Sequence, residues 1–191
     1  MPDGLAADLR QYLQQGRDSL LRSLDGVSEY DARRPLTPSG TNLLGLVKHV
    51  AGVELGYLVE SVGREAPVLP WNEDGSVWEG ADMWALPSEG REYLVDLYRS
   101  AWALSDASIA ELPLDAPASV AWWPQERRQT TFGHVLVRVV AETAQHAGHA
   151  DILREGLDGQ GGPDHDEVGD AATWSAYVAR IQQAAEPFRA T

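Results

Sequence analysis

A carboxylate and two imidazoles interrupt an otherwise apolar helix face in the stretch VVAETAQHAGHADILREG, residues 139–156. At about 100° per residue, Glu142, His146 and His149 fall within an arc of roughly 60°, with apolar positions above and below them. Such groups in an apolar stripe must be paired or bound to something, because an unpaired buried charge is costly. A divalent metal ion would meet that demand.

The spacing of the three side chains narrows the choice of ligands. Glu142 and His146 are i,i+4, the separation with which two side chains on one helix face hold a metal ion. His146 and His149, at i,i+3, form a second pair that can share an ion. Glu142 and His149 lie about 10 Å apart along the helix axis, which is too far for one ion to bind both comfortably. His146 is therefore a ligand in either of the two possible pairs.

A fourth polar residue, His49, lies on the apolar stripe of another predicted helix. A bundle would direct it toward the same interior, so we predict His49, Glu142 and His146 as the ligands of one divalent metal. His149 would lie next to the open coordination position, where we predict a catalytic role for it. Three N/O ligands and an open position are typical of a catalytic ion. Without a thiolate the donor set suits Zn, Ni, Fe or Co, of which we favour Zn or Ni.

Two alternatives stay open at this point. The polar stripe can be a hydrogen-bonded cluster without metal, in contact with Arg138 or with a second subunit. His149 can be a helix-surface residue or a neighbour of a ligand instead of a ligand. His134 lies off the stripe and His165 lies in an acidic loop, so we assign no role to either.

Five segments have the apolar periodicity of amphipathic helices. They cover about residues 5–24, 42–62, 88–109, 131–156 and 173–185. Thr41 or Asn42, Ser88 and Thr131 are predicted to cap the second, third and fourth helices, and Gly156 to end the fourth. Apart from a short extended piece at SVAWW there is almost no strand pattern. We predict an all-α fold: an up-and-down four-helix bundle with long crossover connections and an extra C-terminal helix.

The 191 residues fit one domain, with a core of about residues 5–157 and a C-terminal extension of 158–191. Two Trp-rich connections, about residues 67–90 and 112–131, exceed the usual length, which is typical of a binding loop, a lid or a subunit contact. Arg127 and Arg128 belong either to a pocket rim or to a solvated charge pair. A homodimer through the helices or these connections is compatible with the pattern.

The composition argues against several classes of protein. Fifteen Lys and Arg against 29 Asp and Glu give a net charge of -14, which repels nucleic acids and anionic membranes. The chain has no cysteine, so it has no cysteine nucleophile of its own. No signal peptide or membrane span is recognisable. We therefore expect a cytoplasmic protein that acts on a small molecule and binds neither nucleic acid nor membrane.

The stretches LLGLVKHVAGVE around His49 and AETAQHAGHADILRE around Glu142 and His146 resemble those of the DinB-like superfamily of four-helix-bundle metalloenzymes. That superfamily includes thiol-dependent S-transferases and the mycothiol-dependent maleylpyruvate isomerase. The resemblance covers about residues 5–157 and is closest to an uncharacterised branch with a His-x-Gly-His-Ala-Asp stretch. In many members a Gln stands where this chain has His149, and the isomerase has a tail domain that does not follow here.

The resemblance implies two metal ligands from the fourth helix at i,i+4 and one histidine from the second. It also implies a metal-dependent enzyme that activates a low-molecular-weight thiol, such as mycothiol or bacillithiol, for S-transfer to an electrophile in detoxification or stress metabolism. Metal coordination favours the thiolate, which is the nucleophile. A hydrolase that activates water and a non-catalytic stress protein that binds a metal or ligand are the alternatives.

Overall fold

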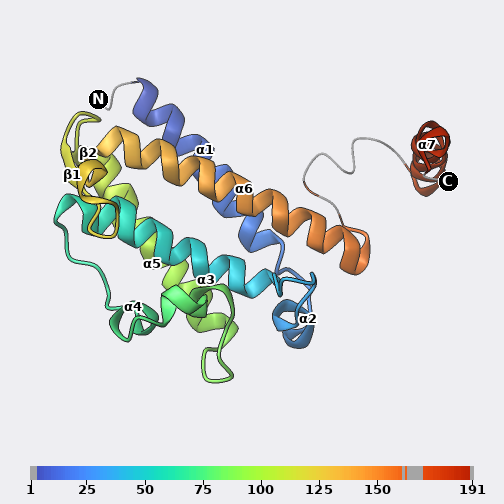
Figure 1. Cartoon of the computed structure of the whole chain (residues 1–191), viewed down its shortest axis with the longest axis horizontal. Helices are drawn as coiled ribbons and strands as arrows, with labels where there is room; N and C mark the ends of the chain where they lie inside the picture. The colour runs from blue at the N-terminus through green and yellow to red at the C-terminus, as the bar shows by residue number, and fades with distance from the viewer. Residues whose placement is uncertain (1–3, 161, 163–169, 190–191) are drawn as a thin grey trace.

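The computed structural model describes residues 4–160, 162 and 170–189, and its long helices form a bundle (Figure 1). These helices are α1 (Gly4–Arg22), α3 (Leu43–Glu54), α5 (Arg91–Glu111) and α6 (Phe132–Asp158). A π-helical turn, η1 (Leu55–Val59), and a 3-10 turn, η2 (Glu60–Val62), continue α3. The predicted all-α bundle is confirmed.

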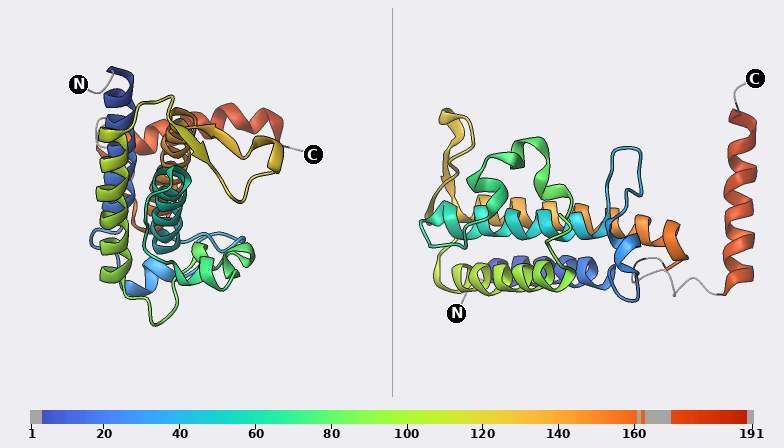
Figure 2. Two further views of the ribbon diagram at one scale, coloured as in Figure 1. Left: turned by 90° about the vertical axis from the view of Figure 1, so that its left-hand side faces the viewer. Right: turned by 90° about the horizontal axis from the view of Figure 1, so that it is seen from below.

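The directions of the helices explain the first of the two long connections, which precedes α5. α1 and α6 run one way along the bundle, and α3 and α5 run the other way (Figures 1 and 2). Because α5 is parallel to α3, the chain must return along the bundle between them. The predicted up-and-down order, in which consecutive helices alternate in direction, is therefore wrong at this step, although the bundle itself is as predicted. This connection holds three short helices, α4 (Pro70–Glu73), η3 (Ser76–Glu79) and η4 (Ala81–Met83).

Two predicted helix caps are confirmed. The side chain of Asn42 accepts a hydrogen bond from the backbone N–H of Gly45 at the start of α3. The side chain of Thr131 accepts one from the N–H of His134 at the start of α6. Both contacts satisfy donors that have no partner within the first helical turn.

Two other predicted helix ends are wrong. α5 begins at Arg91 with Gly90 as its N-cap, because the turn containing Ser88 is held outside the helix by a hydrogen bond from the Leu86 N–H to the Glu89 carboxylate. α6 continues past Gly156 through Asp158. It ends at Gly159, which has a left-handed backbone (φ +77°) that costs glycine little.

A hairpin covers one end of the bundle. Strand β1 (Pro117–Ser119) pairs antiparallel with β2 (Gln129–Thr131), and 3-10 turn η5 (Gln125–Arg127) lies between them. The extended piece was predicted at SVAWW, residues 119–123, whereas β1 begins two residues earlier, at Pro117. The hairpin packs on a cluster of buried apolar side chains from α1, η1 and α6. These include Leu13, Leu58, Phe132, Val135 and Val139.

Two further helices lie outside the long bundle helices. α2 (Glu29–Arg33) forms between the first two predicted helices, in an interval where no helix was predicted, and the Ser28 side chain caps it. α7 (Ala171–Ala185) is the predicted C-terminal helix, followed by 3-10 turn η7 (Glu186–Phe188), and α7 has no buried residue among those described. His165 lies outside the described residues.

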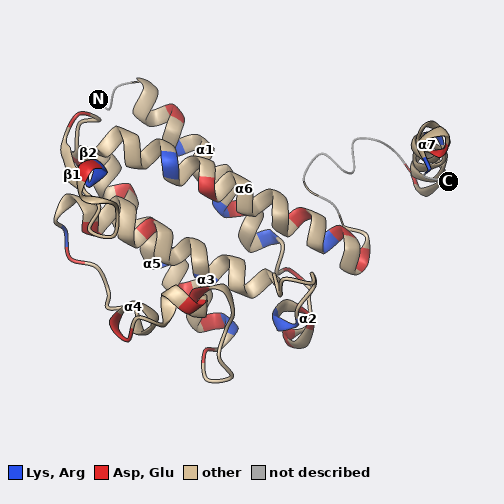
Figure 3. Ribbon diagram, viewed as in Figure 1, with Lys and Arg blue, Asp and Glu red and all other residues tan. Residues whose placement is uncertain are grey.

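The acidic side chains are distributed over the molecule. Figure 3 shows Asp and Glu on each of the four long helices and in the connections. In the part of the chain that is described, no helix is long and apolar enough to cross a membrane.

Candidate metal centre

The structure brings the three predicted ligands together where α3 and α6 face each other. Nε2 of His49 lies 3.7 Å from Oε1 of Glu142, and Nε2 of His146 lies 3.4 Å from the same oxygen. The two imidazole rings meet edge to face with 4.8 Å between centroids. One donor atom from each of the three residues lies within 4.8 Å of the others.

This arrangement fits a divalent ion. Bonds of about 2.0–2.2 Å at a tetrahedral ion place neighbouring ligand atoms roughly 3.4 Å apart. The two distances to Oε1 of Glu142 are close to that spacing. Both histidines present Nε2 to the carboxylate and use Nδ1 for other contacts. The three residues therefore match the donor types and spacing of a three-ligand site.

The apolar stripe predicted a site in the interior of the bundle. The site instead lies at the edge of the bundle. Along α6, Val135 is buried, Glu142 is half-buried and His149 is exposed. A seven-residue step along an α-helix falls about 20° short of two full turns, so residues at this spacing drift around the helix. Here the drift carries the polar end of the stripe toward solvent.

His149 lies outside the group of three. Its Nδ1 is 3.4 Å from Nδ1 of His146, on the side of that ring away from Glu142. It is exposed, and it is not among the described residues whose donor atoms converge. This position suits a neighbour that contacts a ligand.

Asp82 is a further candidate site residue, which the sequence did not reveal. Its Oδ2 accepts a hydrogen bond of 2.6 Å from Nδ1 of His49. A carboxylate in this position fixes the tautomer of a ligating histidine and makes its other nitrogen a better ligand. Asp82 lies in η4, 33 residues from His49 in the chain. No spacing rule links an acid in a long connection to a histidine on a helix.

A close contact between η4 and α3 places Asp82. The buried Lys48 amino group donates to the backbone oxygens of Ala81 and Trp84, one residue before and two residues after Asp82. The Asn42 side chain donates to the Met83 oxygen. A Cβ atom at Gly45 would overlap that same oxygen.

The Asp82→Asn substitution is expected to weaken metal binding about 10- to 100-fold, which is typical for loss of a partner that orients a ligand. The amide keeps the size of the side chain but removes the charge that favours the required tautomer. Competition with a chromophoric chelator would measure the affinity. Glu79→Gln, at an exposed acid three residues earlier, is the matched control. Equal affinities of the two variants would contradict a role for Asp82.

The site keeps His146 suited to ligation at neutral pH. Burial lowers the pKa of His146 below its usual value, and the neighbouring His49 lowers it further, while Glu142 opposes both effects. The neutral imidazole is the form that binds metal.

A cavity of about 420 Å³ opens beside the candidate ligands. His49, Glu142 and Asp82 line it together with aromatic side chains from three parts of the chain. The aromatic residues are Tyr57, Trp71, Trp78 and Trp122. The Trp-rich connections therefore contribute to a pocket, whereas Arg127 and Arg128 are exposed on the hairpin and are not among the described residues that line it.

The π-helical turn η1 positions one wall of this cavity. Tyr57 lies within η1, and its hydroxyl accepts hydrogen bonds from Nε1 of Trp122 at 3.3 Å and Nε1 of Trp123 at 3.0 Å. The Arg138 guanidinium lies 5.1 Å from the centre of the Tyr57 ring. Single π-turns inside helices occur frequently at functional sites, and this one ties the hairpin to the bundle.

Fold and site together define a class: bundle proteins with a candidate metal centre built from facing helices. A protein-family model described as Mycothiol-S-transferase matches residues 8–159. The match covers most of the chain, so the chain belongs to the mycothiol-S-transferase family, and the DinB-like resemblance is confirmed. No curated protein sequence matches the chain.

Proposed function

We propose that the protein is a metal-dependent enzyme that activates a low-molecular-weight thiol for transfer to an electrophilic small molecule. The observation that carries the proposal is the convergence of His49, Glu142 and His146 beside a cavity that the first two of them line, in a chain without cysteine. The attacking sulfur must then come from a diffusible thiol. Membership of the mycothiol-S-transferase family supports the same activity.

His49, Glu142 and His146 would hold the ion, with Zn or Ni as the favoured metal. A divalent ion there supplies a Lewis acid that lowers the pKa of a thiol bound to it. Asp82 holds His49 in the required orientation. His149, which contacts His146 and is exposed to solvent, would accept the proton that the thiol loses.

The aromatic cavity is suited to the rest of the thiol. It combines flat apolar faces with a few polar groups, which is typical of small-molecule sites. Glu60 and Asn72 line it as well and offer hydrogen-bonding partners for hydroxyl groups. A hydroxyl-rich thiol of the mycothiol type matches this lining better than a purely apolar one.

Metal analysis of the purified protein at neutral pH tests the site, and His49→Ala is the comparison. A divalent ion is expected in the unmodified protein and should be lost from the variant. Turnover of 1-chloro-2,4-dinitrobenzene with a panel of low-molecular-weight thiols, mycothiol and bacillithiol included, tests the activity. A thiol-dependent rate above that of the chelator-treated protein is expected. If the unmodified protein and the His49→Ala variant are equally metal-free and equally stable, the metal centre is refuted.

The same assays separate the proposal from its alternatives. Metal without thiol-dependent turnover would favour a binding protein. A metal-dependent hydrolysis of ester probes that needs no thiol would favour water as the activated group.

A further inference from the structure

A second cavity lies beside the candidate metal centre and has no part in the function proposed so far. It is a groove of about 830 Å³ between the first turns of α1 and the first half of α6. Apolar side chains make up much of its wall. They are Leu5, Leu9, Leu114, Val137 and Ala141.

The groove and the aromatic cavity share two residues, Arg138 and Glu142. Glu142 is the candidate ligand whose Oε1 faces both histidines, while its Oε2 lies 3.8 Å from a guanidinium nitrogen of Arg138. The pair therefore forms a ridge with the aromatic cavity on one side and the groove on the other. A molecule at this end of the groove would therefore contact Arg138 and Glu142, the second of which is itself a candidate metal ligand.

Arg138 gives the ridge its positive charge. Among the described residues that line either cavity, it is the one arginine or lysine. Its guanidinium lies over the rings of Tyr57 and Trp123, and 45% of the side chain is exposed. A guanidinium held in this way has N–H groups free to donate to an acceptor in the groove.

We infer that the groove binds the electrophilic co-substrate, and that this co-substrate is an apolar molecule with an electron-withdrawing acceptor group such as a nitro or carbonyl group. The inference rests on the proposed function. The apolar wall would hold the body of the molecule. Arg138 would donate hydrogen bonds to its acceptor group, at the end of the groove nearest the candidate metal centre.

The reaction with a chloronitroarene illustrates the roles. The thiol loses its proton, and the sulfur lone pair forms a bond to the ring carbon that carries chlorine. The negative charge passes to the nitro groups, where Arg138 stabilises it by charge-assisted hydrogen bonds. The carbon–chlorine bond then breaks with its electron pair, so that a thioether, a proton and chloride result.

Filling the groove tests the inference. Val137→Trp adds bulk at a side chain that is 53% exposed and lines the groove but not the aromatic cavity. It is expected to raise the KM for 1-chloro-2,4-dinitrobenzene at least tenfold and to leave the thiol KM and the metal content unchanged. Ala141→Phe fills the same groove one turn further along α6 and should act likewise. Ile152→Trp, at a 70% exposed position of the same helix, is the control.

A binding measurement separates failure of this inference from failure of the proposed function. 1,3-Dinitrobenzene has no leaving group, so its binding can be followed by methyl NMR without turnover. Shifts of the Leu5, Leu9 and Val137 methyl signals are expected. Shifts confined to Val53 and Val77, which line the aromatic cavity, or no shifts at all would overturn the inference even in an active enzyme.

The oligomeric state of the same variants provides one more check. A change of mass in solution on Val137→Trp, without any change in the KM for the electrophile, would make the groove an interface between copies and would overturn the inference. Absence of thiol-dependent turnover together with shifts of the groove methyl signals would refute the proposed function and leave the groove as a ligand site.

Discussion

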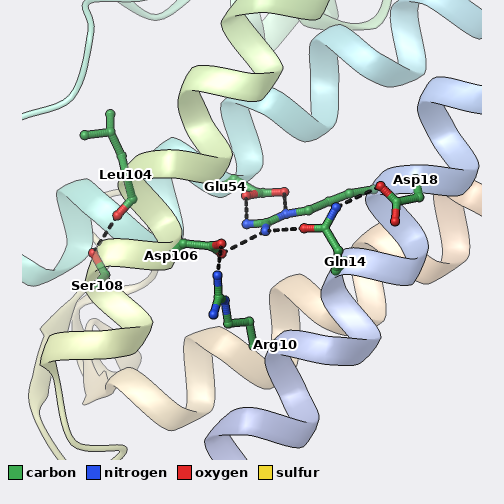
Figure 4. Close-up of polar contacts among 8 residues, drawn as sticks. Arg10, Gln14, Asp18, Glu54, Leu104, Asp106 and Ser108 are labelled. Atoms are coloured by element: carbon green, nitrogen blue, oxygen red, sulfur yellow. Dashed lines mark hydrogen bonds and ion pairs between the residues drawn. The ribbon is translucent and has the colours of Figure 1, made fainter. Parts of the chain in front are cut away.

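Arg17→Met is expected to lower the free energy of unfolding by about 3–5 kcal/mol, the cost of leaving a buried charge without its partner. Arg17 and Glu54 are both fully buried, and two hydrogen bonds of 3.0 and 2.6 Å join them (Figure 4). Arg17 also binds Asp106 at 2.8 Å and lies 5.4 Å from the centre of the Trp102 ring. Its removal leaves the Glu54 carboxylate in the core without a cation.

The loss of stability in this variant should depend on pH. Burial raises the pKa of Glu54 above its ordinary value of 4.5, and Arg17 opposes this effect in the native protein. Without Arg17 the folded state holds a proton on Glu54 more tightly than the unfolded state does. Stability contributed by a raised carboxyl pKa is present at low pH and is lost as the pH rises. Arg17→Met should therefore be least destabilising near pH 4 and most destabilising at neutral pH.

Arg10→Met is the matched control. Arg10 binds the same Asp106 at 2.6 Å, but 54% of its side chain is exposed. Exposed ion pairs contribute about 0–1 kcal/mol, so this variant should unfold almost as the unmodified protein does. Denaturant titrations of both variants at several pH values would measure the difference. Similar midpoints for the two would show that the buried pair does not determine stability.

The double variant Arg17→Met, Glu54→Met would distinguish the cost of an unpaired Glu54 carboxylate from the cost of altered packing around Arg17. Replacing both charges with apolar side chains of similar volume is often neutral or stabilising. Most of the stability lost on Arg17→Met is therefore expected to return. If it does not, the cost arises from the packing around Arg17 and not from the unpaired carboxylate.

Much of the fold was predictable, because amphipathic periodicity is a local property of the sequence. The four long helices and α7 follow from the spacing of their apolar residues. The same spacing marks Arg17, four residues after Leu13 and three before Leu20, as a charge on a buried stripe. The argument that selected Glu142 thus applies to Arg17 as well. A charge on an apolar stripe can belong to a structural ion pair or to a metal site. The two can be told apart only when the residue that contacts this charge in the fold is known.

The parts that were not predictable depend on contacts between segments distant in the chain. Asp82 reaches His49 because Lys48 and Asn42 hold η4 against α3, which no local pattern encodes. Ser88 and Gly156 have the residue types of helix ends. Tertiary contacts and the continued packing of α6 decide those boundaries instead.

His146→Ala and His149→Ala are expected to have very different effects on metal binding, although the two imidazoles are three residues apart on one helix. His146 presents Nε2 to Glu142 and is largely buried, with 13% of its side chain exposed. Loss of a ligand should cost more than the 10- to 100-fold that is typical of an orienting partner, so the metal affinity should fall by more than about a hundredfold. Thiol-dependent turnover should be lost with it.

His149→Ala should retain the metal. Its ring contacts Nδ1 of His146 and not the group of three donor atoms, so the affinity should fall at most about tenfold, within the range for an orienting partner. A role in accepting the proton of the thiol would appear as a lower kcat at neutral pH, with partial recovery as the pH rises and the thiol ionises unaided. Equal loss of metal from both variants would instead place His149 among the ligands, as the i,i+3 spacing allows.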